Sequence, residues 1–185
     1  MTCIVGVVEK GKVWIGGDSA GVAGYDLMVR SDPKVFRNGD FVMGYTSSFR
    51  MGQLLAHRFQ PPKRHADQDV YVYMVTSFVD ALRQCFKDGG YASKENEREQ
   101  GGQFLVGYEG RLFEIGGDYQ VGENLDGYAA CGCGGSIALG ALHATSSECP
   151  TDRIRSALSA SERHNAGVRG PFVVIGPEDK AKALA

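Results

Sequence analysis

The sequence predicts an α+β fold, and two observations lead to this prediction. Its apolar segments come in blocks: strands, two helices, strands again, two more helices and a last strand. Grouped strands and helices are typical of a layered α+β architecture rather than of alternating βαβ units. The chain has 185 residues, of which 43% are hydrophobic, and this suits one globular domain over residues 1–185.

The first block of strands begins at the N-terminus. Val- and Ile-rich segments at residues 2–8 and 13–17 flank Glu9-Lys10-Gly11-Lys12, whose glycine supplies the positive φ that a hairpin turn needs. We expect an extended stretch over residues 27–36 and a short strand over residues 41–45 to follow. Chain ends usually fray, so a strand that begins at residue 2 indicates that this terminus is held in place for a reason.

Two helices separate this block from the next. Ser47 and Ser48 are suitable N-caps for the first helix, whose apolar residues recur at helical spacing until Pro61. The second helix is predicted over residues 69–87, before Gly89 and Gly90. Its predicted apolar stripe consists of Val72, Val75, Val79, Leu82 and Phe86, with Tyr71 and Tyr73 on other faces.

The second half of the chain contains four more predicted strands and two more helices. Glu109-Gly110 is a tight hairpin turn between two of these strands. The helices begin after small or polar residues that suit helix starts. The strands are expected over residues 104–108, 111–115, 128–132 and 171–175, and the helices over about residues 136–146 and 151–164.

Composition and charge argue against two classes of partner. The formal net charge is −2 and the charged residues are spread along the chain, whereas a nucleic-acid-binding surface needs clustered Lys and Arg. The densest charge run, residues 94–99, has mixed signs and is expected to be a solvated loop or helix end. The apolar runs are too short to span a membrane, and the N-terminus lacks the pattern of a signal peptide. We therefore expect neither a nucleic-acid nor a membrane partner.

The cysteines indicate neither a disulfide framework nor a metal site. There are five of them at irregular spacing, so the reducing cytoplasm is the expected location. Cys131 and Cys133 form a single Cys-x-Cys pair without a second pair or a nearby histidine, so we interpret both as small buried strand residues. The glycines that follow lack the Lys-Ser/Thr of a phosphate-binding loop, and no cofactor is expected.

Thr2 is the first candidate catalytic residue. Removal of Met1 would give Thr2 a free α-amino group with an unperturbed pKa of about 8. Such an amine accepts the proton of the threonine's own hydroxyl, directly or through a water, and so activates it as a nucleophile. A threonine at position 2 is common and usually inert, so the hypothesis depends on the residues around it.

Asp18 and Lys34 strengthen the hypothesis. A hairpin returns its second strand beside its first, so Asp18, which ends the second predicted strand, comes back near Thr2. A lysine close to the Thr2 hydroxyl would lower the hydroxyl pKa and stabilise developing negative charge, and Asp18 would hold that lysine in place. Taken alone, Asp18 would be interpreted as a turn residue and Lys34 as a surface lysine.

The opening of the chain resembles a known family, the proteasome-type N-terminal-nucleophile hydrolases. Thr2 followed by Ile-Val, the Lys-Gly-Lys hairpin, Gly-Gly-Asp18-Ser and Lys34-Val are similar to proteasome β subunits and still more to HslV-type peptidases. Asp18 stands 16 residues after Thr2, and Lys34 stands 16 residues after Asp18, which is the spacing of the family. The likeness continues at residues 41–48 and 130–136, whereas residues 60–125 match only in layout.

The resemblance implies a fold, a reaction and a set of supporting residues. The fold would be a four-layer αββα sandwich, and the reaction would be amide hydrolysis through an acyl-enzyme on Thr2. A backbone N–H at a helix start would bind the oxyanion, and this position falls at Ser47, give or take one residue. Three departures stand out: Ser47-Ser48 replaces Gly-Gly, Cys133 replaces a supporting serine, and Asn165 lies where the family has an aspartate. We interpret His164 as a helix-end cation rather than a catalyst.

The resemblance also implies partners. Family members form closed homo-oligomeric rings around a chamber, act on peptides or unfolded proteins, and work with an ATPase unfoldase, so we expect the same here. Two alternatives stay open. Instead of a peptidase, the chain would then be a structural subunit that assembles without cleaving, or a small-molecule amidohydrolase on the same fold.

Overall fold

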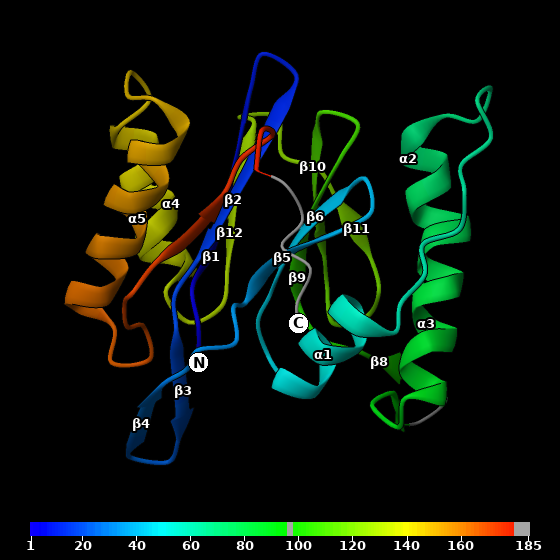
Figure 1. Cartoon of the computed structure of the whole chain (residues 1–185), viewed down its shortest axis with the longest axis horizontal. Coiled ribbons are helices and arrows are strands. Elements are labelled where there is room, and N and C mark those ends of the chain that lie inside the picture. Colours follow the sequence, from blue (N-terminus) through cyan, green and yellow to red (C-terminus); the bar gives the residue numbers. More distant parts are fainter. Residues whose placement is uncertain (96–97, 180–185) are drawn as a thin grey trace.

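The computed structural model describes residues 1–95 and 98–179, and within them two antiparallel sheets form the centre of the molecule (Figure 1). The strand order of the first sheet is β12 (Tyr128–Cys131), β1 (Ile4–Glu9), β2 (Lys12–Gly17) and β13 (Val173–Ile175). The strand order of the second is β11 (Val121–Gly122), β10 (Arg111–Ile115), β9 (Phe104–Tyr108), β6 (Phe41–Tyr45) and β5 (Val35–Asn38).

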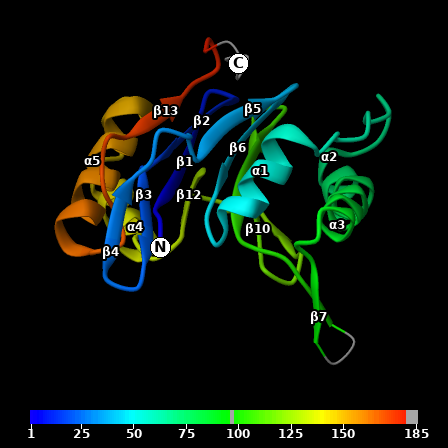
Figure 2. The ribbon, with the colours of Figure 1, turned by 60° about the horizontal axis from the view of Figure 1, so that its bottom comes forward.

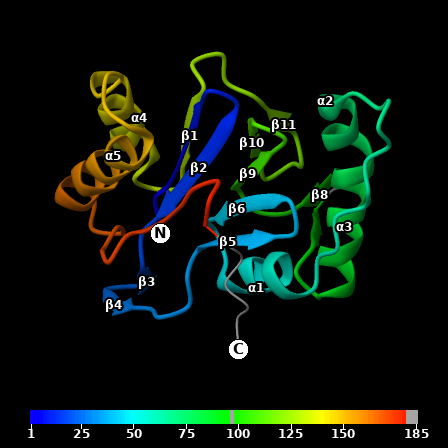
Figure 3. The same cartoon turned by 45° about the horizontal axis from the view of Figure 1, so that its top comes forward.

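Helices cover the outer face of each sheet (Figures 1 and 3). The first sheet is covered by α4 (Gly135–Ala144) and α5 (Pro150–His164). The second is covered by α1 (Phe49–His57) and by one long helix composed of α2 (Val70–Tyr73), the π-helical segment η1 (Met74–Phe78) and α3 (Val79–Asp88). The predicted mixture of sheets and helices is confirmed. None of the described helices combines the length and apolarity needed to cross a membrane.

Buried apolar clusters lie between these layers. Because side chains alternate along a strand, β1 contributes to two of the clusters. Val5 and Val7 pack with α4 and α5, as does Cys3 just before the strand, while Ile4 packs with residues of the second sheet such as Leu105. The N-terminal strand is therefore held from both faces, and this fixes the position of the residues that precede it.

The region after β2 differs from the prediction. In place of one extended stretch over residues 27–36, β3 (Ala20–Ala23) and β4 (Asp26–Val29) form a separate hairpin, and β5 begins only at Val35. Pro33 lies in the break, where its lack of a backbone N–H prevents continuous strand pairing. The hairpin extends from the body close to the N-terminus (Figure 2).

A second hairpin replaces part of the predicted loop or helix end over residues 94–99. Its strands are β7 (Ser93–Glu95) and β8 (Arg98–Gln100), and it projects away from the body in Figure 2. Residues 96 and 97, which also belong to that prediction, lie outside the described residues. These short strands pair with each other and not with the main sheets, so the sequence shows no alternating apolar pattern for them.

The predicted apolar stripe on the long helix is wrong in its first half. Val72 and Val75 are 47% and 37% exposed, whereas Tyr73 is 1% exposed. The cause is η1, because a π-helical turn adds one residue and rotates the preceding segment about the helix axis. Tyr73 belongs to the monomer core, so of the tyrosine pair only Tyr71 remains available to an interface.

Candidate active site

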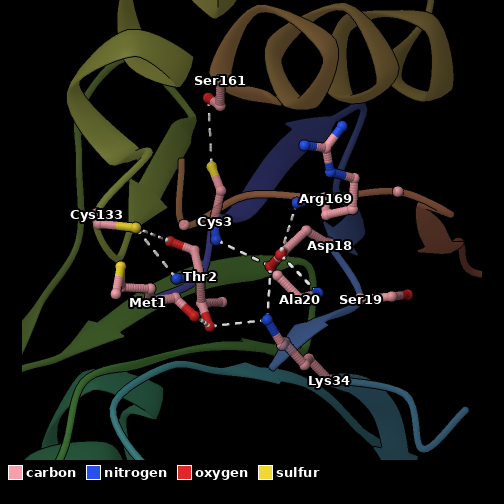
Figure 4. Close-up of polar contacts among 12 residues, drawn as sticks. Met1, Thr2, Cys3, Asp18, Ser19, Ala20, Lys34, Cys133, Ser161 and Arg169 are labelled. Atoms are coloured by element: carbon pink, nitrogen blue, oxygen red, sulfur yellow. Dashed lines mark hydrogen bonds and ion pairs between the residues drawn. The ribbon is translucent and has the colours of Figure 1, made fainter. Parts of the chain in front are cut away.

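Thr2, Asp18 and Lys34 lie together where β1 begins and β2 ends (Figure 4). The Lys34 Nζ atom is 2.8 Å from Thr2 Oγ1 and 2.8 Å from Asp18 Oδ1. All three residues are buried, with exposed fractions of 5% for Thr2 and 1% each for Asp18 and Lys34. The lysine thus bridges a hydroxyl and a carboxylate that come from the two strands of one hairpin.

Three backbone N–H groups orient the Asp18 carboxylate. The Cys3 N–H donates to Oδ1 at 3.0 Å, and the Ala20 and Arg169 N–H groups donate to Oδ2 at 2.9 and 3.2 Å. Hydrogen bonds to an ionised acceptor are the stronger kind, so the carboxylate is held facing Lys34. No side-chain pattern in the sequence could have revealed these donors, because any residue type supplies a backbone N–H.

Two features of the environment of Lys34 have opposite effects on its pKa. Burial lowers the pKa of Lys34, and the neighbouring Asp18 carboxylate opposes part of this effect. The Phe49 ring, whose centroid is 5.9 Å from Lys34 Nζ, also lies against the lysine. Sequence reasoning missed Phe49, since an aromatic residue in the first turn of a helix is usually part of the core.

The backbone of Thr2 is bound by the turn that follows β12. The Thr2 N–H donates to Cys133 Sγ at 3.2 Å, and the Gly134 N–H donates to the Thr2 carbonyl at 3.3 Å. Gly132 allows this approach, because it has a φ of 92° and a Cβ there would lie 2.3 Å from the Thr2 carbonyl oxygen. Thr2 also donates its hydroxyl hydrogen to the Met1 carbonyl.

Cys131 and Cys133 have different environments. Cys131 ends β12, is 2% exposed, and its burial raises its thiol pKa well above the ordinary value. Cys133 is exposed and faces Thr2 (Figure 4), because the chain turns at Gly132. The interpretation as buried strand residues is right for Cys131 and wrong for Cys133. Within residues 1–95 and 98–179, no group of three His, Cys, Asp or Glu side chains is arranged to hold a metal ion.

Asn165 follows the end of α5 and contacts the same turn. Its Nδ2 donates to the Cys133 carbonyl at 2.8 Å, and its Oδ1 accepts from Cys133 Sγ at 3.2 Å and from the Gly167 N–H at 2.9 Å. His164 is the last residue of α5 and is exposed. The structure therefore brings Asn165 to the site through Cys133.

Ser47 and Ser48 have different roles at the start of α1. Ser48 is the N-cap, since its Oγ accepts from the N–H groups of Arg50 and Met51. Ser47 has a φ of 64°, a left-handed conformation that favours glycine. The Ser48 N–H donates to the Thr46 carbonyl at 2.7 Å. The Ser47 N–H donates to no acceptor among the residues that the structure describes, and so remains available to a ligand.

Comparison with known proteins gives a structural but not a sequence relationship. No protein-family model matches the chain, and no curated protein sequence matches it. Among solved structures, Thiobacillus denitrificans BPH matches with a TM-score of 0.77 at 20% identity, over 94% of this chain and 96% of that one. Eukaryotic HslV from Trypanosoma brucei matches with a TM-score of 0.66 at 19% identity, over 94% and 98% of the two chains.

The chain has the proteasome/HslV-type fold. A further structure with this fold, an Anbu mutant from Hyphomicrobium sp. strain MC1, matches with a TM-score of 0.65 at 17% identity, over 94% of this chain and 80% of that one. The resemblance noted in the opening residues is thus confirmed by the proteasome/HslV-type fold of nearly the whole chain.

Proposed function

We propose that this chain is a threonine peptidase whose nucleophile is the Thr2 hydroxyl once Met1 has been removed. The observation that carries the proposal is the position of Lys34 Nζ, 2.8 Å from both Thr2 Oγ1 and Asp18 Oδ1. A buried ion pair is costly to form and adds little to stability. Its presence against a hydroxyl at the chain start is better explained by catalysis than by a scaffold role. The fold that we propose for this peptidase is a single domain with four layers in the order αββα.

In the proposed reaction, Thr2 Oγ1 attacks the carbonyl carbon of the substrate amide while the α-amino group takes up the hydroxyl proton. The Lys34 ammonium lowers the hydroxyl pKa, and the free Ser47 N–H binds the oxyanion that forms. The C–N bond then breaks, the amine passes its proton to the leaving nitrogen, and an ester on Thr2 remains. A water molecule, deprotonated by the same amine, hydrolyses the ester and regenerates Thr2.

Met1 controls this chemistry. While Met1 is attached, the Thr2 nitrogen belongs to a peptide bond, and such a nitrogen does not act as a base. The unprocessed chain is therefore expected to be inactive, and removal of Met1 is expected to activate it.

The proposed partners follow the likeness to HslV. We infer that the substrates are peptides or unfolded proteins, that copies of the chain form a closed homo-oligomeric ring, and that an ATPase unfoldase delivers folded substrates. Exposed apolar side chains on the β3–β4 hairpin, such as Tyr25 and Met28, are compatible with subunit contacts. The five free cysteines fit the cytoplasm as the proposed location.

The test compares fluorogenic-peptide hydrolysis by Met1-free variants. Thr2→Ala and Lys34→Ala should each lower kcat/KM by at least about a hundredfold, the typical effect of losing one catalytic group. Thr76→Ala and Lys12→Ala are matched controls on the surface and should leave activity unchanged. Unchanged hydrolysis by Thr2→Ala would falsify the mechanism.

The same assay separates the two alternatives. Mass spectrometry first establishes that Met1 is absent. If the processed wild-type chain then hydrolyses small amides but not peptides, it is an amidohydrolase. If it hydrolyses neither, a structural role replaces the peptidase proposal.

A further inference from the structure

Met1 lies beside the groups that the proposed reaction uses. Its carbonyl carbon is bonded to the Thr2 nitrogen, and its carbonyl oxygen accepts a hydrogen bond from Thr2 Oγ1 (Figure 4). The Met1 peptide group therefore contacts both the proposed base and the proposed nucleophile. Met1 is 55% exposed, so it occupies an open position at the surface rather than an enclosed cavity.

The side chain of Met1 lies against the turn at Gly167 and the Cys133 thiol. The three atoms nearest to a Cβ placed on Gly167 would be Met1 Cβ at 2.5 Å, Cys133 Sγ at 2.8 Å and Met1 Sδ at 2.9 Å. These distances are too short for a real Cβ, so a side chain at position 167 would take space that Met1 fills. The φ of Gly167 lies outside the left-handed region, so it is the space beside Met1, and not the backbone conformation, that requires a glycine.

The leaving fragment of a substrate must enter the space that Met1 fills. In the proposed reaction the Thr2 amine passes its proton to the leaving nitrogen, which requires the two nitrogens to lie about 2.6–3.2 Å apart. The leaving nitrogen is also bonded to the carbon that Thr2 Oγ1 attacks. A position that satisfies both conditions is adjacent to the Thr2 nitrogen and to Oγ1, and the Met1 peptide group stands there in the unprocessed chain.

We propose that the space occupied by Met1 becomes, after its removal, the subsite for the first residue of the leaving fragment, and that this subsite selects an unbranched apolar side chain like that of methionine. The inference rests on the proposed function. Gly167 and Cys133 border the subsite and determine its specificity. In the unprocessed chain, Met1 fills the subsite as a leaving-fragment residue would.

The atoms around Met1 explain this selectivity. Cys133 Sγ faces two oxygen acceptors, the Thr2 carbonyl and Asn165 Oδ1, so a substrate carboxylate in the subsite would meet acceptors rather than donors. An unbranched thioether or alkyl chain needs no hydrogen bond and packs well against sulfur. A β-branched side chain carries a second heavy atom on Cβ, and Cβ is the Met1 atom nearest to the Cβ position of Gly167.

The first experiment measures binding and needs no turnover. Met1-free protein is titrated with methionine amide, which represents the start of a leaving fragment, and the chemical shift of the Gly167 amide is followed by NMR. Methionine amide should bind about fivefold more tightly than glycine amide, as partial burial of the methionine side chain predicts. The chain that retains Met1 is the matched control and should show no saturable shift, because its own Met1 fills the subsite.

Equal binding of methionine amide to the chains with and without Met1, or equal affinities for the two amides, would overturn the subsite. The titration and the peptidase assay fail separately. A processed chain that hydrolyses no peptide refutes the proposed function, while the titration still shows whether the vacated space binds an unbranched apolar residue.

The second experiment measures the same preference during turnover. Internally quenched peptides carry methionine, valine, glutamate or glycine directly after the cleaved bond and are otherwise identical. For Met1-free protein, kcat/KM should be about fivefold higher with methionine than with glycine, and valine and glutamate should be poorer than methionine. Equal values for the four peptides would contradict the proposed selectivity.

A pair of glycine variants tests whether residue 167 sets this preference. Gly167→Ala places a methyl group in the subsite and should reduce the methionine-to-glycine ratio of kcat/KM from about five to about one. Gly140→Ala is the matched control, because Gly140 lies in α4 with no atom within 4 Å of its Cβ position, and it should keep the ratio. A ratio that Gly167→Ala leaves unchanged would show that the leaving fragment binds elsewhere.

Discussion

Two opposing effects, burial and a neighbouring carboxylate, act on the charge of the Lys34 side chain. Its ammonium is removed from water, which disfavours charge, and it lies 2.8 Å from a carboxylate, which favours charge. The balance leaves the pKa of Lys34 below its ordinary value of 10.5. Folding is therefore penalised while the ammonium is charged, and this penalty disappears as the pH rises towards 10.5.

The Asp18→Asn variant tests this balance. Loss of the carboxylate leaves burial unopposed, so the pKa of Lys34 should fall further. In the proposed mechanism, activity needs the charged lysine, so the alkaline limb of the kcat/KM profile should move to lower pH. A pH series with a fluorogenic peptide measures the limb, and an unchanged or upward-shifted limb would show that Asp18 does not sustain the charge.

The Cys133→Ser variant tests the role of the thiol beside Thr2. A hydroxyl can donate to Asn165 Oδ1 and accept from Thr2 as the thiol does, and it is the stronger hydrogen-bonding group. We therefore expect kcat/KM to be kept or raised. Cys133 is exposed, so the free energy of unfolding should change by less than about 0.5 kcal/mol. A large loss of stability would identify the thiol as a packing residue.

At the scale of elements, the π-helical segment η1 decides which face of the long helix is buried. Before η1 the core residue is Tyr73, whose hydroxyl donates to the Pro62 carbonyl at 2.6 Å. After η1 the buried residues are Val79, Leu82 and Phe86, as the helical period predicts. One inserted residue therefore explains why the predicted apolar stripe is correct after η1 and wrong before it.

A pair of neighbouring tyrosines tests this arrangement. Tyr73→Ala removes a buried ring and should lower the free energy of unfolding by about 3–5 kcal/mol. Tyr71→Ala removes a side chain that is 42% exposed and should cost less than about 1 kcal/mol. Urea unfolding of both variants gives the comparison, and equal losses would contradict the rotation caused by η1.

At the scale of the whole molecule, the property that we expect is assembly into a ring. The active site of a single peptidase subunit would be accessible to every polypeptide in the cell, whereas a closed ring of subunits would enclose it. The β3–β4 hairpin, which presents Tyr25 and Met28 to solvent, leads directly from Asp18 towards Lys34 in the chain. Contacts of this hairpin with a neighbouring copy would thus reach close to the site.

Light scattering at micromolar concentration tests the assembly. We expect a mass that is a multiple of the 19.9 kDa of one chain, with one species at a fixed stoichiometry. A monodisperse monomer would exclude both the chamber and the ATPase partner, and it would favour the amidohydrolase alternative.

The sequence by itself determined the class of fold and predicted that Thr2, Asp18 and Lys34 lie together, as they do in the structure. Hairpin turns, apolar strands and fixed spacings are local properties, so they are visible along the chain. Only the tertiary structure decided the surroundings of these residues. The backbone donors to Asp18, the exposure of Cys133, the amide orientation of Asn165 and the register change at η1 all depend on contacts between distant segments. Backbone groups are the same in every residue, and a turn such as that at Gly132 redirects the side chains that follow, so no local pattern encodes these features.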